Sequence, residues 1–248
     1  MYFIGIDLAW SPKNNSGVSI IDSNHSLTKY GVCKSDDEII DFIFSTIKTD
    51  NCLIAIDAPL IVPNETGRRP CEAQISNLFR TYHAGAHPSN RNRFLQWSPV
   101  VRGEELVKKL ESIGIVHDPY IELYEESRKC FEVFPHPSMV VLFNLEKILK
   151  YKSKPGRDHE FLCNEFQKYQ MHLKKLEKSN PALYLPEELT NKDLSELKGK
   201  KLKEYEDILD SVFCGYIALY AWNNPNKCKV FGDMEKGYIL TPISNHMR

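Results

Sequence analysis

The chain has 248 residues, of which 42% are hydrophobic and 26% are charged, and its formal net charge is −1. This composition is typical of globular proteins and excludes a collagen-like or low-complexity chain. The apolar runs are far shorter than the ~20 residues of a membrane-spanning helix, and no basic segment precedes the first of them, as it does in a signal peptide. We therefore expect a cytoplasmic protein with a single domain over residues 1–248.

The beginning of the chain is typical of strands. Apolar runs predict strands over residues 2–9, 17–21 and 27–33, and the turn residues before Gly17 join the first two as a hairpin. Apolar residues at helical spacing predict a helix from Asp36 to Ile47. A buried strand over 52–57 follows and is ended by Pro59.

The middle of the chain is rich in Pro, Gly, Asn and Arg and has weak periodicity. It predicts an irregular insertion over about 59–125, with short helices near 71–81 and 104–113. The remaining elements are expected to be a strand at 130–134, helices at about 137–149, 158–177 and 202–223, and a hairpin of 230–232 with 238–240. Strands joined by hairpins pair antiparallel, whereas strands reached through helices pair in parallel. The predicted fold class is α/β, with a mixed five-stranded sheet flanked by helices.

Acidic residues occur where a buried strand would not tolerate them. Asp7 and Asp57 lie at the ends of the first and fourth predicted strands, and Glu132 lies inside the fifth. An unpaired buried carboxylate is costly, and any one of these acids alone could be a strand-end cap or half of an ion pair. Asp207 and Asp210 share one face of the last long helix, where a polar first turn is the simpler alternative. Together the five acids predict a catalytic site.

Clustered carboxylates repel each other unless a cation lies between them. Hard oxygen ligands suit Mg²⁺ or Mn²⁺, and the sequence offers no matched set of His and Cys ligands for zinc. Two such ions about 4 Å apart activate a water molecule and stabilise the leaving oxygen of a phosphodiester. The acids therefore favour a magnesium or manganese site.

Basic residues gather locally although the chain is nearly neutral. Five arginines and one acid lie between residues 68 and 93, and Arg68, Arg69 and Arg91 are candidates to bind phosphates bidentately. Salt bridges to nearby acids are the alternative for each of them. Lys152 belongs to a second run, from Lys147 to Arg157, that contains no acid. Such patches are compatible with a nucleic-acid partner.

Three histidines are further substrate-binding candidates. His83 and His87 have the spacing of two metal ligands on a helix, but Gly85 and Pro88 argue against a helix there. Contact with a phosphate or a base, or a structural role in the loop, remain open for both. His136 follows Glu132 closely and could act as a general acid or base, or be an ordinary strand-end histidine.

These motifs resemble a known family. The placing of the acids is similar to that in the ribonuclease H-like superfamily, and the chain more closely resembles the family of predicted RNase H-like nucleases called domain of unknown function 429. The matching segments extend over nearly the whole chain. They are residues 5–10 (GIDLAW), 56–60 (IDAPL), 66–72 (TGRRPCE), 83–91 (HAGAHPSNR), 132–137 (EVFPHP), 150–152 (KYK) and 206–210 (EDILD).

The resemblance implies a ribonuclease H-like fold and a metal-dependent nuclease that hydrolyses phosphodiester bonds. It implies that Asp7, Asp57, Asp207 and Asp210 hold the metal. The chain departs from the superfamily at Ala9, where glycine is frequent. Three alternatives stay open: a phosphotransferase of the actin and sugar-kinase group, a non-catalytic nucleic-acid-binding or scaffold protein, and a hydrolase acting on a small phosphorylated substrate.

Overall fold

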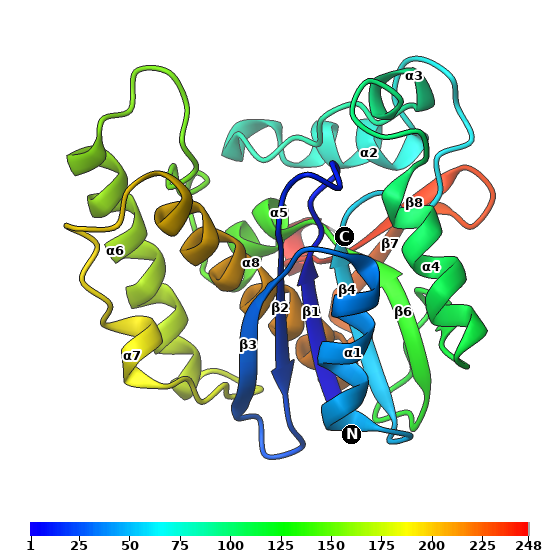
Figure 1. Cartoon of the computed structure of the whole chain (residues 1–248), viewed down its shortest axis with the longest axis horizontal. Coiled ribbons are helices and arrows are strands. Elements are labelled where there is room, and N and C mark those ends of the chain that lie inside the picture. The colour runs from blue at the N-terminus through cyan, green and yellow to red at the C-terminus, as the bar shows by residue number, and fades with distance from the viewer. Residues whose placement is uncertain (248) are drawn as a thin grey trace.

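The computed structural model describes residues 1–247, apart from the side chain of His246, and its centre is a mixed sheet in the strand order β3-β2-β1-β4-β6-β5 (Figure 1). β1, β2 and β3 pair antiparallel, whereas β4, β5 and β6 continue in parallel. The strands are β1 (Tyr2–Asp7), β2 (Ser16–Ile21), β3 (Leu27–Cys33), β4 (Cys52–Asp57), β5 (Val116–His117) and β6 (Arg128–Glu132).

This is the expected α/β class, and the topology is consistent with a ribonuclease H-like fold. The sheet has six strands rather than the five expected. The additional strand, β5, has two residues and pairs with the edge of β6. A two-residue strand is too short to show the alternation of apolar and polar residues from which strands are predicted.

Helices cover both faces of the sheet. Alternate residues of β1, such as Ile4 and Ile6, pack on one face against α1 and α4, while Phe3 faces α8 on the other. The helices of the chain are α1 (Asp36–Ile47), α2 (Pro70–Leu78), α3 (Arg91–Phe94), α4 (Arg102–Ser112), α5 (Pro135–Leu142), α6 (His159–Lys175), α7 (Glu187–Thr190) and α8 (Gly199–Asn223). Short 3₁₀ turns lie at Arg80–Tyr82, Leu176–Lys178, Pro225–Lys227 and Asn245–Met247.

The insertion between β4 and β6 is more ordered than its sequence predicts, because it contains α2, α3, α4 and β5. A separate hairpin of β7 (Cys228–Asp233) and β8 (Gly237–Pro242) packs against α2 through Cys71, Ile75 and Ile239. The helix expected over 137–149 is the shorter α5, and Asn144 beyond it adopts φ 52°. That left-handed conformation does not continue a right-handed helix.

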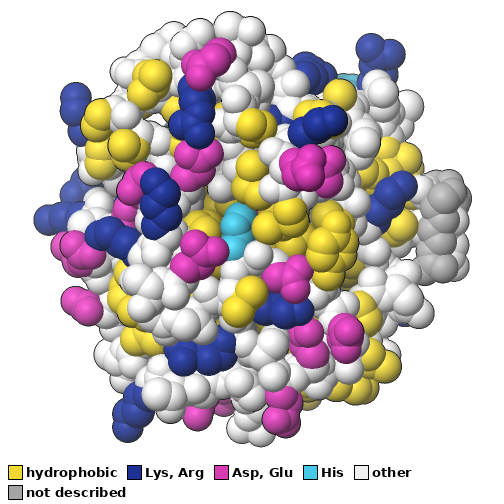
Figure 2. All heavy atoms as spheres, turned by 90° about the vertical axis from the view of Figure 1, so that its right-hand side faces the viewer, with side chains coloured by type: hydrophobic (Ala, Val, Ile, Leu, Met, Phe, Trp, Pro, Cys, Tyr) yellow, Lys and Arg dark blue, Asp and Glu magenta, His cyan; other side chains and the backbone are white. Residues whose placement is uncertain are grey.

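The carboxyl ends of the parallel strands meet at one edge of the sheet, beside the amino-terminal part of α8 and the insertion (Figure 1). The face toward α4 and the β7–β8 hairpin carries acidic and basic side chains mixed with small apolar patches (Figure 2). Within residues 1–247, no helix combines the length and apolar character needed to cross a membrane.

Candidate active site

Two of the expected acids are neighbours across the centre of the sheet. β1 and β4 run in parallel, and Asp7 is directly opposite Asp57 in their register. Each is the last residue of its strand, and both side chains line the same cavity. Parallel pairing therefore places two carboxylates side by side where the hydrogen-bonded ladder ends.

The helix α8 adds two more acids because glycines let it lie directly on the strands. A Cβ added to Gly5 would lie 1.8 Å from the carbonyl oxygen of Ser211, and one added to Gly17 would lie 1.9 Å from that of Asp207. Only residues without a Cβ allow such a close approach. Asp207 and Asp210 are consequently buried, at 4% and 0% exposure, against the ends of β1 and β4.

Burial and mutual repulsion make Asp7, Asp57 and Asp207 reluctant to ionise, so that their pKa values lie above the usual range. Burial raises the pKa of Asp7, and the charge of Asp210 raises it further. The pKa of Asp57 lies well above its usual value, first because of burial and then because of Asp7. Burial and Asp7 raise the pKa of Asp207 to about 8, and these two carboxyl groups share a hydrogen bond. Near neutral pH the group therefore retains protons that a bound cation would displace.

Two lysines supply positive charge to the acids. Lys152 Nζ lies 2.8 Å from Asp210 Oδ2, and Lys203 Nζ lies 2.6 Å from Asp207 Oδ1. Burial lowers the pKa of Lys152, but the charge of Asp210 and the other acids outweighs burial and keeps it well above its usual value. The Lys203 side chain is more exposed, although its ammonium group turns inward and also contacts Glu206 at 2.7 Å.

Asp210 is the most deeply held member of the group. Its Oδ1 accepts a hydrogen bond from the Tyr151 hydroxyl at 2.7 Å, and the Tyr169 hydroxyl lies 3.3 Å away. Within residues 1–247, its Oδ2 accepts no hydrogen bond of good geometry, although the ammonium of Lys152 lies 2.8 Å away. This buried oxygen therefore already has a cationic neighbour, the Lys152 ammonium.

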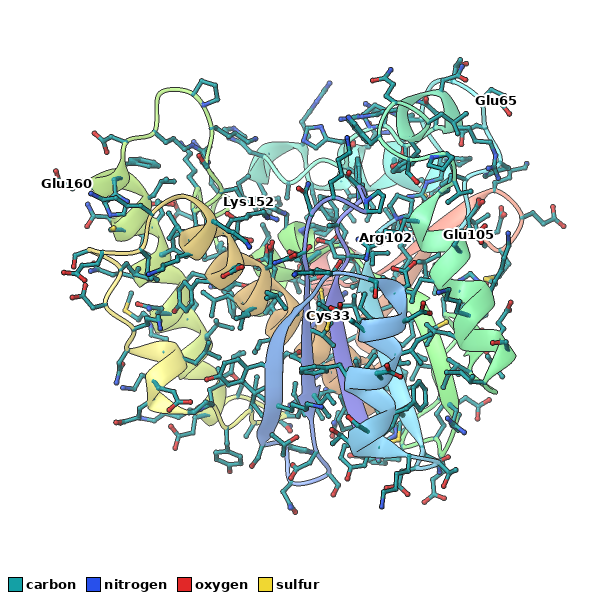
Figure 3. The ribbon with its side chains drawn as sticks, in the orientation of Figure 1. Cys33, Glu65, Arg102, Glu105, Lys152 and Glu160 are labelled. Atoms are coloured by element: carbon teal, nitrogen blue, oxygen red, sulfur yellow. The ribbon has the colours of Figure 1, made fainter. Side chains whose placement is uncertain are left out.

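A cavity of about 390 Å³ opens beside the carboxylates. Its size is within the range of pockets that take small ligands. Asp7 and Asp57 line it together with basic residues from the loop before α6, among them Lys152, which is labelled in Figure 3. The remaining polar lining residues are Lys154, Arg157, His83, His87 and His136. The cavity thus brings carboxylates and basic side chains together.

The three histidines predicted to bind substrate do line this cavity. Burial lowers the pKa of His87, and the nearby Arg93 and Lys154 lower it further. Burial lowers the pKa of His136 to about 3, so the imidazolium form that a general acid uses is not populated near neutral pH. The His136 ring is stacked at 9° to that of Tyr151, and its Nδ1 has no hydrogen-bond partner among the described residues.

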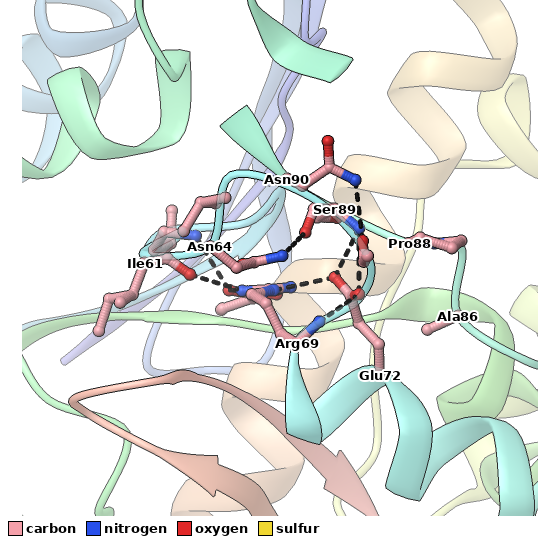
Figure 4. Close-up of polar contacts among 12 residues, drawn as sticks. Ile61, Asn64, Arg69, Glu72, Ala86, Pro88, Ser89 and Asn90 are labelled. Carbon is pink, nitrogen blue, oxygen red and sulfur yellow. Dashed lines mark hydrogen bonds and ion pairs between the residues drawn. The ribbon is translucent and has the colours of Figure 1, made fainter. Parts of the chain in front are cut away.

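Arg69 and Glu132, by contrast, are engaged with each other inside the protein. The Arg69 guanidinium contacts Glu132 Oε1 at 2.6 Å and Glu72 Oε1 at 2.9 Å, and it donates to the Ile61 carbonyl. Glu72 in turn accepts from the Ser89 amide, as Figure 4 shows. Arg69 is 1% exposed. Arg69 therefore forms a buried ion pair that holds the insertion to β6, as the salt-bridge alternative predicts. The catalytic role of Glu132 stays a prediction.

The other two arginines differ from one another. Arg91 forms an ion pair with Glu104 at 3.0 Å, as the salt-bridge alternative predicts. Arg68 is exposed and is close enough to His87 to lower the pKa of that imidazole. Arg102, labelled in Figure 3, was not singled out from the sequence; it donates to the Ala9 carbonyl and to Asp36 and so holds the segment that follows Asp7.

The carboxylates of the cluster fit Mg²⁺ or Mn²⁺ because they offer hard oxygen ligands. Among them, Asp210 Oδ2 accepts no hydrogen bond from the residues described. Within residues 1–247, however, no three His, Cys, Asp or Glu side chains already surround a common point as ligands. The ammonium of Lys152 holds the position nearest Asp210 Oδ2. Binding of a cation would require Lys152 to move away from that oxygen.

Three basic site residues could have been found more directly in the sequence. Lys203 is four residues before Asp207 on α8, which is the spacing of a helical ion pair. Lys154 and Arg157 belong to the basic run that also contains Lys152. The Arg157 guanidinium donates to the carbonyls of Lys150 and Lys152 and thereby holds the loop that lines the cavity.

Comparison with known proteins identifies the family of the chain. No curated protein and no solved structure matches it. The model of one family, described as protein of unknown function (DUF429), matches residues 5–236. This match extends from β1 to the β7–β8 hairpin and includes all four clustered aspartates. The chain therefore belongs to the DUF429 family.

Proposed function

We propose that this protein hydrolyses phosphodiester bonds in nucleic acid and that Asp7, Asp57, Asp207 and Asp210 hold Mg²⁺ or Mn²⁺. The observation that supports this most directly is the convergence of four carboxylates from β1, β4 and α8 on one edge of the sheet. When bound, such ions supply an activated water and a stabilising charge for the leaving oxygen.

The residues of the chain itself prepare the site in two ways. Lys152 neutralises part of the carboxylate charge and also faces the cavity, where it can contact a phosphate. Lys154 and Arg157 line the same cavity and add positive charge, which favours a polyanion over a neutral ligand. The neutral imidazole of His136 also lines the cavity, and its buried Nδ1 has no hydrogen-bond partner among the described residues.

Cleavage of labelled single-stranded, duplex, branched and hybrid nucleic acids, with and without Mn²⁺, tests this proposal. We expect wild type to cleave at least one of them only with metal, and Asp7→Asn to lose about 100-fold or more of the rate. Asp50→Asn, which removes an exposed carboxylate at the opposite edge of the sheet, is the matched control. Equal rates for Asp7→Asn and Asp50→Asn would refute the proposal.

A small phosphate ester is the second candidate substrate, because the cavity volume of about 390 Å³ suits a ligand of that size. Mononucleotides and aryl phosphate mono- and diesters added to the same assay separate the two. Metal-dependent turnover of these esters alone, lost in Asp7→Asn, would favour the second candidate.

A further inference from the structure

A second hollow lies beside the same carboxylates and is not part of the cavity described above. It has a volume of about 670 Å³ and is bordered by the β1–β2 turn, the residue after β3 and the first turns of α8. We call it the lysine groove, and it is lined by Lys13, Lys34, Lys200, Lys203, Glu204 and Asp207. It contributes four lysines against two acids.

Most of the positive charge in the lysine groove is available to a ligand. Lys13 and Lys34 are exposed, and neither ammonium forms an ion pair or hydrogen bond within the described part of the chain. Lys200 is 77% exposed, and its Nζ lies 3.6 Å from Glu204 Oε1. Such an exposed ion pair contributes little to stability in water, so Lys200 can exchange Glu204 for a ligand. On the face in Figure 2, by contrast, charges of both signs are mixed. The lysine groove is therefore a basic surface next to the carboxylates.

The carboxylates lie between the lysine groove and the cavity. Asp207 lines the groove, Asp7 lines the cavity, and their carboxyl groups share a hydrogen bond. The cavity has its own basic residues in Lys152, Lys154 and Arg157. A ligand with a single phosphate could use only one of these basic regions, whereas a chain of phosphates could use both.

An aromatic cluster on the cavity side suits unpaired bases. Trp10 lines the cavity, its ring centroid is 5.9 Å from that of Trp97, and Trp97 is 41% exposed. The Arg93 guanidinium lies 5.7 Å from both ring centroids. A basic groove combined with exposed aromatic rings is the arrangement by which proteins bind single-stranded nucleic acid.

We propose that a single-stranded polynucleotide lies across the carboxylates, with phosphates on one side of the scissile bond held by Lys13, Lys34 and Lys200. On the other side the strand enters the cavity, next to Lys154, Arg157 and Trp10. This inference rests on the proposed function and names its substrate class. It assigns a role in binding to three lysines that are remote from the cavity.

The test compares two triple variants of equal charge. Lys13→Ala with Lys34→Ala and Lys200→Ala removes the groove lysines but keeps Lys203, which contacts Asp207. Lys48→Ala with Lys178→Ala and Lys227→Ala removes three other exposed lysines outside both hollows. Fluorescence anisotropy measures binding of labelled 12-nucleotide DNA and RNA single strands, a duplex and a dinucleotide, as a function of salt in EDTA and in Mg²⁺.

Wild type should bind a single strand at least about tenfold more tightly than the dinucleotide. The groove variant should lose most of that difference, and its slope of log K against log salt should be less steep by about 2, since each phosphate contact of a single strand contributes about 0.7. The control variant should keep the wild-type slope. Tighter binding of the duplex, or equal slopes for the two variants, would overturn the inference.

EDTA removes the metal that cleavage would require, so binding is measured on intact strands. The strand path and the nuclease activity can therefore be refuted separately. If the groove variant has a less steep salt dependence of binding and wild type cleaves nothing, the proposed strand path is supported and the proposed nuclease activity is refuted. If wild type cleaves nucleic acid and the groove variant binds it with unchanged affinity and KM, the proposed nuclease activity is supported and the proposed strand path is refuted.

Discussion

Asp7, Asp57 and Asp207 are destabilised when they are charged, and the charges of Lys152 and Lys203 offset part of that cost. Asp207 illustrates the balance, since it contacts Lys203 and yet its pKa rises to about 8 through burial and Asp7. The folded protein therefore binds this proton more tightly than the unfolded chain does. Folding stability should fall as pH rises from about 4 towards 8, and the cost is complete above pH 8.

The variant Asp207→Asn removes this titration. We expect it to be more stable than wild type at pH 9 by about 1–3 kcal/mol and to lose that advantage near pH 4, where both proteins are neutral at this position. Urea unfolding at the two pH values measures the difference. Asp50→Asn keeps Asp207 and should therefore show the same pH dependence of stability as wild type. An Asp207→Asn variant less stable than wild type at pH 9 would contradict this account.

Lys152 is the internal counter-ion of the cluster, because its ammonium contacts Asp210 Oδ2 and its charge also acts on Asp7 and Asp57. In Lys152→Met we expect a lower melting temperature in EDTA and a Kd for Mn²⁺ that is tighter by about tenfold, or about 1.4 kcal/mol. Calorimetry and thermal denaturation measure these effects. Lys154→Met, which changes an exposed lysine of the cavity, should alter the melting temperature and the Kd for Mn²⁺ by less. Equal effects of the two variants would argue against the counter-ion role of Lys152.

At the scale of elements, the approach of α8 to the sheet decides where Asp207 and Asp210 lie. Gly5→Ala would place a methyl group 1.8 Å from the Ser211 carbonyl, so backbone must move. We expect a loss of about 3 kcal/mol or more in the free energy of unfolding. Gly31→Ala on β3 is the control, since its nearest neighbour would be a side-chain atom at 3.4 Å. Equal stabilities of the two variants would show that the close contact is unimportant.

The insertion is attached to β6 by the buried group of Arg69, Glu72 and Glu132. Arg69→Met leaves two buried carboxylates without their partner, and we expect it to cost about 3–5 kcal/mol in denaturant unfolding. Arg68→Met, one residue away and exposed, should change stability by less than about 0.5 kcal/mol. If the two variants were equally stable, the ion pair would not be what holds the insertion.

The sequence predicted the elements that carry strong periodicity and missed those that depend on tertiary contacts. β1, β4 and α8 were expected because their apolar patterns are long, and the acids stood out against those patterns. β5 was missed because two residues show no pattern, and its pairing depends on β6. The burial of Arg69 was also not predictable, since an arginine between Arg68 and Pro70 has the sequence context of an exposed loop.

In the whole molecule, the carboxylates lie at the junction of a basic cavity and a basic groove. The sequence could place Lys152 near a polyanion from its basic run, but it could not show that Lys13 and Lys34 lie beside Asp207. Those lysines come from different loops that the order of β1, β2 and β3 brings together. This local concentration of positive charge, in a chain with a net charge of −1, is the basis on which we propose a nucleic-acid partner.

Calorimetric titration of Mn²⁺ into the purified protein at pH 8 tests the central claim most directly. At a free Mn²⁺ concentration of 100 times Kd, binding should increase the free energy of unfolding by about 2.7 kcal/mol. For a protein of this size, that increase corresponds to a rise of ~5–10 °C in melting temperature. We predict binding to wild type and to Asp50→Asn, and its loss in Asp57→Asn. Absence of Mn²⁺ binding to wild type, or undiminished binding to Asp57→Asn, would contradict the assignment of the carboxylates as a metal site.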